Sequence, residues 1–255
     1  MKRLNNLLSG KKILIMGAAN KRSIAWGCAQ SMIDNGADLI FTYQNERLKK
    51  SLNRLVQDES RLVECDVSSD ESIEKAFAQV AERFGKVDGI VHAIAFAKKE
   101  ELAGDIMNSS REGYALAQNI SAYSLIAVAK YGIKILNDPA SIVTLTYFGS
   151  ERAIPNYNVM GVAKAALEAN VRYLARDMAK YGVRVNAISA GAVKTLAVTG
   201  VKDHGDLLRL SRERTVDGES VTTDQIGGAA SFLVSDLSTG VVGDVIYVDK
   251  GVHLI

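Results

Sequence analysis

Short apolar segments alternate with segments of helical periodicity along almost the whole chain, and this alternation restricts the possible folds more than any other feature. Between the apolar runs, hydrophobic residues recur every three or four positions, as at Ile73, Phe77, Val80 and Phe84. Runs as apolar as these suit strands that are covered on both faces. We therefore predict an α/β fold: a doubly wound, seven-stranded parallel sheet with six helical stretches. The predicted strands are residues 12–16, 38–43, 61–66, 87–95, 141–147, 184–189 and 244–248.

Composition excludes several classes of protein. The 255 residues include 31 Lys and Arg against 29 Asp and Glu, a net charge of +2, which argues against nucleic-acid binding. We expect no membrane span, because no apolar run approaches about 18 residues, and no export signal. Two cysteines, Cys28 and Cys65, and three scattered histidines predict no metal site and favour a cytoplasmic protein with reduced thiols. We expect a single domain over residues 1–255.

One connection is longer than the others. Residues 191–220 separate the sixth strand from the next helical stretch and carry many charges. A long insert at the carboxyl end of a parallel strand is a common position for a substrate-binding lid. We predict such a lid here, with a solvated surface loop as the alternative.

The first strand-to-helix connection predicts a phosphate site. Gly17 directly follows the first strand, and the next helix begins near Ser23. The backbone N–H groups of a helix start can face a pyrophosphate. We expect Gly17 to permit the tight turn and Gly27 to let the helix pack closely on the sheet. The spacing is not the usual GxGxxG, so a simple turn is the alternative.

The ends of the next strands indicate which nucleotide binds. Gln44 stands where many dinucleotide sites carry an acidic residue, and no Arg or Lys at 44 or 45 is placed to pair a 2′-phosphate, which favours NADH over NADPH. Asp66 either accepts from an adenine amino group or acts as a cap-like turn residue before the next helix. The small residues after His92 leave room for a ribose and a substrate, while His92 itself reads as structural.

A tyrosine and a lysine form the candidate catalytic pair. Tyr157 and Lys164 are seven residues apart, so in a helix they lie on one face, two turns and about 10 Å apart. An ammonium group can stabilise an ionised or strongly donating phenol and can also hold ribose hydroxyls. A tyrosine beside a lysine therefore has a chemical use at the mouth of a nucleotide-binding fold.

Around these residues the chain resembles the short-chain dehydrogenase/reductase family, in the divergent branch that includes the bacterial NADH-dependent enoyl-[acyl-carrier-protein] reductases of type I. The likeness covers nearly the whole chain and is most specific over residues 151–161, with Tyr147 ten residues before Tyr157. Ordinary members place the lysine four residues after the tyrosine, whereas here Lys164 follows by seven. Further matching segments are 17–27, 41–44, 65–67, 183–191 and 195–197.

The resemblance implies a Rossmann-like fold, a homotetramer and the reduction of trans-2-enoyl thioesters on acyl carrier protein by NADH, the last reductive step of type II fatty acid elongation. Tyr157 would stabilise the enolate oxygen, Lys164 would hold the nicotinamide ribose, and Tyr147 would assist in positioning or protonation. The substrate would contact Ala97, Tyr147 and Tyr157. The cofactor would contact Gly17, Ser23, Ile24, Gln44, Asp66, Val67, Ile94, Lys164, Val193, Lys194, Thr195, Leu196 and Ala197.

The chain departs from the family pattern near the predicted lid. Ala192 stands where members usually have Pro, residues 215–219 replace a Thr-Pro-Leu-Arg-like run, and Lys250 replaces a small residue. Loss of two prolines raises the entropy that closure must offset, by up to about 1 kcal/mol each. Two other functions therefore stay open: a carbonyl or alcohol oxidoreductase on the same scaffold, and a non-catalytic nucleotide-sensing protein.

Overall fold

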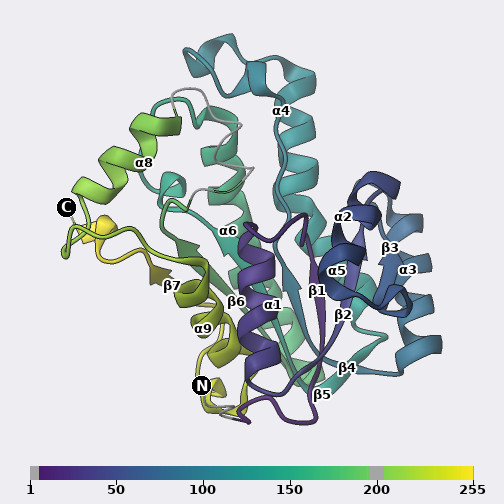
Figure 1. Ribbon diagram of the computed structural model, residues 1–255. Coiled ribbons are helices and arrows are strands. Elements are labelled where there is room, and N and C mark those ends of the chain that lie inside the picture. Colours follow the sequence, from purple (N-terminus) through teal and green to yellow (C-terminus); the bar gives the residue numbers. More distant parts are fainter. Residues whose placement is uncertain (1–5, 194, 196–203, 255) are drawn as a thin grey trace.

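Seven parallel strands form one sheet in the order β3-β2-β1-β4-β5-β6-β7 (Figure 1). The computed structural model describes residues 6–193, 195 and 204–254. The chain order reverses between β1 and β4, the position where doubly wound sheets bind their ligands. The predicted fold is therefore confirmed. The strands are β1 (Lys12–Met16), β2 (Asp38–Tyr43), β3 (Leu62–Glu64), β4 (Val87–His92), β5 (Leu136–Thr146), β6 (Val183–Ala190) and β7 (Val245–Val248).

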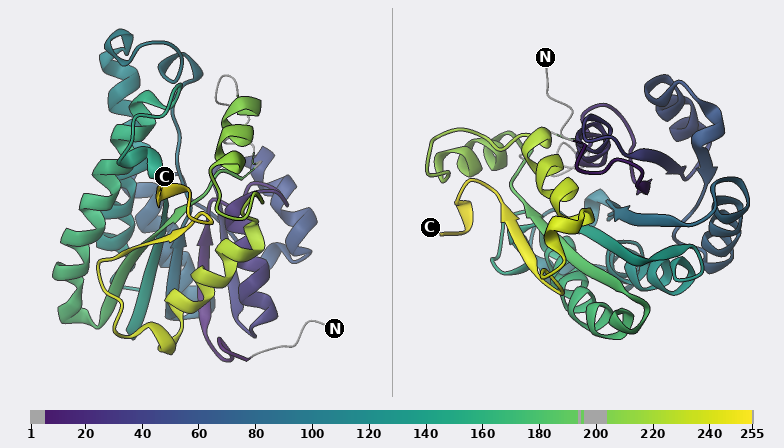
Figure 2. Two further views of the ribbon diagram at one scale, coloured as in Figure 1. Left: turned by 90° about the vertical axis from the view of Figure 1, so that its left-hand side faces the viewer. Right: turned by 90° about the horizontal axis from the view of Figure 1, so that it is seen from below.

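Two helix layers cover the sheet, and Figure 2 shows the sheet between them. The helices α3, α5 and α6 contribute to the apolar core on one face, and α1, α2 and α9 to the core on the other. This arrangement explains why the strands are apolar on both faces. The helices are α1 (Ile24–Asp34), α2 (Glu46–Val56), α3 (Asp70–Phe84), α4 (Arg111–Gln118), α5 (Ser124–Gly132), α6 (Asn158–Met178), α8 (His204–Glu213) and α9 (Thr223–Val234).

Several strand ends differ from the sequence prediction. The fourth strand ends at His92 rather than at residue 95. Beyond His92, Ala93 makes one more hydrogen bond to the neighbouring strand, from its N–H to the carbonyl oxygen of Met16, and the chain then leaves the sheet. The third strand is shorter than predicted, and Cys65 makes the corresponding last bond to Tyr43. The fifth strand begins five residues earlier, since residues 136–140 are partly polar and escape an apolar pattern.

Gly27 serves a different contact from the one predicted. A Cβ on Gly27 would lie 2.6 Å from the Cβ of Thr223 on α9, and one on Gly227 of α9 would lie 2.5 Å from the carbonyl oxygen of Gly27. Paired glycines therefore let α1 and α9 cross at close range. The close packing is of helix on helix, rather than of helix on sheet.

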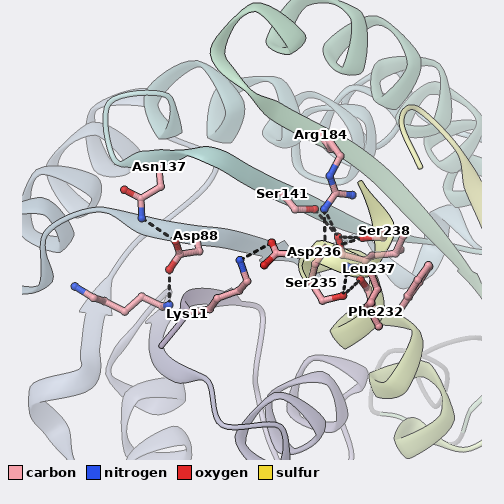
Figure 3. A network of polar contacts seen from close by, with 12 residues as sticks. Lys11, Asp88, Asn137, Ser141, Arg184, Phe232, Ser235, Asp236, Leu237 and Ser238 are labelled. Carbon is pink, nitrogen blue, oxygen red and sulfur yellow. Dashed lines mark hydrogen bonds and ion pairs between the residues drawn. The ribbon is translucent and has the colours of Figure 1, made fainter. Parts of the chain in front are cut away.

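The amino ends of the strands are held by a network of polar contacts (Figure 3). Asp88 accepts from the N–H of Lys12 at 2.7 Å and from the side-chain amide of Asn137 at 2.8 Å. Arg184 donates to the carbonyl oxygens of Leu233 and Ser235, at 3.1 and 3.2 Å. These bonds fix the edge of the sheet that lies opposite the candidate site.

The long connection after β6 contains a helix that the sequence analysis did not assign. Helix α8 projects beyond the carboxyl edge of the sheet, as does the segment that leads into α4 (Figure 1). The chain after α8 is tied to the loop that follows β7: Val216 donates its N–H to Lys250, whose ammonium pairs with Asp217 at 2.6 Å. Two departures from the family pattern, residues 215–219 and Lys250, therefore contact each other.

No helix within the described parts of the chain is both long and apolar enough to cross a membrane.

Candidate functional site

A cavity of about 490 Å³ opens at the carboxyl edge of the sheet, beside the switch point. Its walls come from five segments of the chain: 17–25, 93–102, 145–147, 157–164 and 190–193 with Thr195. The loops after β1, β4, β5 and β6 thus meet at one place, as expected for parallel strands.

The turn after β1 forms one end of the cavity. Gly17 has φ +94°, and a Cβ there would lie 2.1 Å from the carbonyl oxygen of Ala93, so only glycine fits without displacing the β4 loop. Ser23 caps α1 by accepting from the N–H of Trp26. Asn20 lines the cavity, and its side-chain Nδ2 is buried without a hydrogen-bond partner. An unpaired buried donor beside an open helix start fits an anionic ligand such as a pyrophosphate.

The predicted adenine end lies outside the residues that line this cavity. Gln44 donates its side-chain amide to Asp66 at 3.2 Å, which joins the ends of β2 and β3. Asp66 also accepts from the N–H and hydroxyl of Ser68, at 2.9 and 2.8 Å. Burial works to raise the pKa of Asp66, but these hydrogen bonds outweigh it and lower the pKa. Asp66 therefore holds a turn, while the cap of α3 is Ser69.

Two glycines bring the catalytic candidates together. Gly149 lies in the turn after β5, and a Cβ there would lie 2.6 Å from the ring of Tyr157. Gly161, on the first turn of α6, approaches the carbonyl oxygen of Gly149 equally closely, at 2.7 Å for an added Cβ. The start of α6 therefore packs directly on the turn, and the rings of Tyr147 and Tyr157 meet edge to face at 5.1 Å.

Lys164 is a buried residue of α6 that lines the same cavity. Its side chain is only 6% exposed, and its Nζ donates to the carbonyl oxygen of Leu145 at 2.7 Å. Burial lowers the pKa of Lys164 to about 8, while Glu168 acts in the opposite direction. Tyr157 and Lys164 both line the cavity, but they do not lie on one helix as the spacing predicted. Helix α6 begins at Asn158, whose φ is +28°, so Tyr157 is the residue that precedes the helix.

Both phenols are held in the protonated form. Burial raises the pKa of Tyr157, and Tyr147 and Glu168 raise it further. Burial also raises the pKa of Tyr147, with Arg214 opposing the rise. At neutral pH each hydroxyl is therefore a hydrogen-bond donor, which is what an oxyanion-stabilising group needs.

Apolar side chains form a wall that sequence reasoning missed. Phe96, Leu102 and Met160 line the cavity, and Leu102 and Met160 belong to a small apolar cluster packed against Ala97 and Tyr157. Such a wall suits an acyl chain. The sequence could have indicated Met160, because it stands only three residues after Tyr157. Phe96 and Leu102 lie in an irregular loop, where no periodicity marks them.

The structure brings most of the predicted site residues to this one cavity. Those that line it are Gly17, Ser23, Ile24, Ile94, Ala97, Tyr147, Tyr157, Lys164, Val193 and Thr195. Gln44, Asp66 and Val67 do not. Lys194, Leu196 and Ala197 lie outside the described residues.

His92 is structural, as predicted. Its ring nitrogens are both 2.9 Å from hydroxyls, Nδ1 from Thr144 and Nε2 from Ser124, and the side chain is fully buried. Burial, reinforced by the charge of Lys164, lowers its pKa to about 3, so the imidazole is neutral at pH 7. Within the described residues, no group of three His, Cys, Asp or Glu side chains is arranged to hold a metal ion.

Comparison with known proteins places this geometry in a family. A family model described as Enoyl-(Acyl carrier protein) reductase matches residues 17–253. The enoyl-[acyl-carrier-protein] reductase [NADH] FabI of Enterococcus faecalis is 59% identical over 247 residues, covering 97% of this chain and 99% of the relative. The enzyme of the same name from Escherichia coli is 49% identical, covering 96% of this chain and 94% of the relative.

Solved structures agree with these sequence matches. The enoyl-acyl carrier protein reductase of Bacillus cereus, solved with NADP⁺ and indole naphthyridinone, has a TM-score of 0.95 at 47% identity, with 98% of each chain covered. An enoyl-[acyl-carrier-protein] reductase (NADH) from Aquifex aeolicus has a TM-score of 0.94 at 44% identity, again covering 98% of each chain.

Proposed function

The chain belongs to the enoyl-(acyl carrier protein) reductase family, and from that premise we propose that it reduces the C2–C3 double bond of trans-2-enoyl thioesters on acyl carrier protein, with NADH. This reaction is the last reductive step of type II fatty acid elongation. The observation that carries the proposal is the cavity itself, whose walls include both the Gly17 turn and the Tyr157–Lys164 pair.

The residues around the cavity fit a nicotinamide dinucleotide. The unpaired Nδ2 of Asn20 and the N-terminus of α1 suit the pyrophosphate, and the absence of a Cβ at Gly17 leaves the backbone accessible. Exposed Gln44 provides an amide in place of a cation for a 2′-phosphate, which supports NADH as the cofactor. When bound, NADH supplies a hydride to C3 of the enoyl group.

Tyr157 acts as the oxyanion-stabilising donor. Hydride addition at C3 moves negative charge onto the thioester oxygen, and the Tyr157 hydroxyl donates a hydrogen bond to that oxygen. Its raised pKa keeps the proton on the phenol, so the group works as a donor throughout. Protonation at C2 then completes the reduction, with the proton supplied through solvent.

Tyr147 and Lys164 support this donor. The rings of Tyr147 and Tyr157 pack edge to face with their centroids 5.1 Å apart, which restricts the orientation of Tyr157. The ammonium of Lys164 holds the ribose hydroxyls of the cofactor and provides positive charge near the developing enolate. The seven-residue spacing places the phenol further from the lysine in sequence than the four-residue spacing of ordinary family members does. This suits a reaction in which the oxygen that gains negative charge is several bonds from C3, the carbon that accepts hydride.

The activity is tested by following NADH absorbance with crotonyl thioester and, separately, with a β-keto thioester. Oxidation with the crotonyl compound is the expected result. Oxidation with the β-keto compound alone would identify a carbonyl reductase instead, and binding of NADH without oxidation of either would identify a nucleotide-sensing protein. Tighter binding of NADPH than of NADH in the same titration would overturn the assignment made from Gln44.

The substrate reaches the site as a thioester of acyl carrier protein, beneath a lid that we assign to residues 191–220. Acyl carrier protein is acidic, so the arginines near α8 are candidates to receive it. Arg209 also pairs with Glu213 at 2.9 Å. Reversing the charge of Arg209 and Arg214 is expected to raise the KM for the carrier-bound substrate. An unchanged KM would remove this docking surface. Lys194 and Lys202 lie outside the described residues.

The assembly is a homotetramer in a reducing, cytoplasmic setting. Exposed aromatic side chains support an oligomer, among them Tyr173 on α6, which is 70% exposed. Both cysteines are free, buried thiols, as a reducing compartment favours. Light scattering at assay concentration is expected to give four times the mass of the chain, and a monomer mass would contradict the assignment.

A further inference from the structure

Glu168 is a buried acid that the proposed reaction does not use. Its side chain lies on α6, one turn beyond Lys164, and is only 8% exposed. Positions 161, 164 and 168 share one face of α6, so Glu168 follows Gly161 and Lys164 along that face, and Lys164 lines the cavity. Removing a carboxylate from water is costly, so its retention here calls for a partner.

Direct hydrogen bonding satisfies Glu168 less fully than it satisfies the other buried acids. Glu101 accepts from the N–H and hydroxyl of Ser110. Asp249 accepts from two backbone N–H groups and contacts the ring of His253. Glu168 accepts only from the hydroxyl of Thr146, at 2.5 Å, among the hydrogen bonds of the described residues, and none of the ion pairs between described residues includes it.

Thr146 connects this acid to the lysine through the end of β5. Thr146 is 3% exposed and follows Leu145, whose carbonyl oxygen accepts from Lys164 at 2.7 Å. Two successive strand residues therefore hold the two charged side chains, one through a hydroxyl and one through a carbonyl. This pairing fixes where the carboxylate and the ammonium lie relative to each other.

We propose that Glu168 is a positioning residue for Lys164: fixed by the hydroxyl of Thr146, its carboxylate keeps the buried ammonium charged and directed toward the carbonyl oxygen of Leu145 at the wall of the cavity. The inference rests on the proposed function, because Lys164 matters there as a charged group beside the cofactor. Glu168 acts through Lys164 and is not itself in contact with the reacting atoms.

Charge interactions at the site agree with this role. Glu168 opposes the effect of burial on Lys164, whose pKa is lowered to about 8. The other titratable groups that face this pair are Tyr157 before α6, His92 on β4 and Tyr247 on β7, and Tyr147 in turn contacts Tyr157. Because His92 is neutral and the phenols are protonated at pH 7, Glu168 is the charge that offsets the ammonium.

The direct test measures the titration of Lys164 in protein labelled with ¹³C at the lysine ε carbon, without cofactor or substrate. The Lys164 signal is identified by its loss in Lys164→Arg. In Glu168→Gln the midpoint is expected to fall by about one pH unit, because an opposite charge has been removed from a buried ammonium. Asp177→Asn, an exposed acid on the same helix, is the matched control and is expected to leave the midpoint unchanged.

A second pair of variants tests the link through β5. Thr146→Val is expected to shift the Lys164 midpoint in the same direction as Glu168→Gln, and Thr146→Ser to restore it. The Kd for NADH is also measured against pH in wild type and in Glu168→Gln. As pH rises, NADH binding is expected to weaken at a lower pH in the variant than in wild type. An unchanged midpoint in Glu168→Gln, or an equal shift in Asp177→Asn, would overturn the inference. These readouts need no enoyl substrate, so a failure of the proposed function is seen separately, in the crotonyl assay.

Discussion

The two ends of the parallel sheet treat their polar side chains differently. At the amino end, Asn137 donates to Asp88, which also accepts from the N–H of Lys12, and Arg184 donates to backbone carbonyl oxygens. At the carboxyl end, the Nδ2 of Asn20 has no hydrogen-bond partner among the described residues, and Lys164 donates to the carbonyl oxygen of Leu145, with both residues at the cavity wall. The same fold thus uses polar groups for stability at one edge and leaves them available for a ligand at the other.

The largest effect is expected at the carboxyl end, where one hydroxyl carries the chemistry. Tyr157→Phe is expected to lower kcat for crotonyl thioester by about 10² to 10³-fold, as for the loss of one oxyanion donor, with NADH affinity and Tm nearly unchanged. Tyr181→Phe, at an exposed tyrosine that does not line the cavity, is the control. Enoyl reduction at the normal rate in Tyr157→Phe would remove the proposed role.

Glycines at the two ends of β1 offer a matched comparison. Gly17→Ala places a Cβ 2.1 Å from the carbonyl oxygen of Ala93, whereas at Gly10, also at positive φ, an added Cβ meets nothing within 4 Å. Gly17→Ala is expected to cost about 3 kcal/mol of unfolding free energy and to weaken NADH binding. Gly10→Ala is expected to cost about 1 kcal/mol, from backbone strain alone. Equal losses in urea unfolding would show that the turn after β1 is not tightly packed.

At the amino end, substitution is expected to change stability without changing catalysis. Arg184→Met removes the guanidinium hydrogen bonds to the carbonyl oxygens of Leu233, Ser235 and Val241, and is expected to lower the free energy of unfolding by about 2 kcal/mol. The kcat should stay within twofold of wild type. Arg54→Met, an exposed arginine on α2, is the control. A large fall in kcat with intact stability would break the division between the two ends.

An effect of similar size is expected from pH, through the buried, neutral His92 on β4. The folded pKa of His92 is about 3, whereas an unfolded histidine titrates near 6.5. As pH falls from 6.5 toward 3 the unfolded chain takes up a proton that folded His92 does not, so stability is lost in this window. Between pH 7 and 5 this amounts to about 2 kcal/mol. In His92→Gln the free energy of unfolding is expected to lose that share of its dependence on pH. Identical slopes of unfolding free energy against pH in the variant and in wild type would contradict the buried, neutral state of His92.

Much of the fold was readable from the sequence, because the strands are apolar on both faces and the helices keep their periodicity. The errors fell where local pattern carries no information. Residues 136–140 are strand despite their polar character, since register with β4 and β6 decides pairing there. The role of Gly27 depended on Thr223, almost two hundred residues away, which no local motif reveals.

The candidate site was predictable only in part, for a similar reason. Tyr157 and Lys164 are close in sequence, so local spacing alone indicated that both belong to one site, although Tyr157 precedes α6 rather than lying on it. Phe96 and Leu102 come from an irregular loop that has no sequence periodicity. The role of Glu168 depends on its hydrogen bond with Thr146, which the sequence does not reveal. The contact of Lys250 with Asp217 likewise joins two positions that the sequence shows only as separate departures.

The most direct test of the central claim is a crystal structure of the protein with NAD⁺ and a non-reactive enoyl thioester. The Tyr157 hydroxyl is expected within about 2.8 Å of the thioester oxygen, with the Lys164 ammonium bonded to the nicotinamide ribose. A thioester oxygen held by other groups, with Tyr157 turned away from it, would contradict the mechanism.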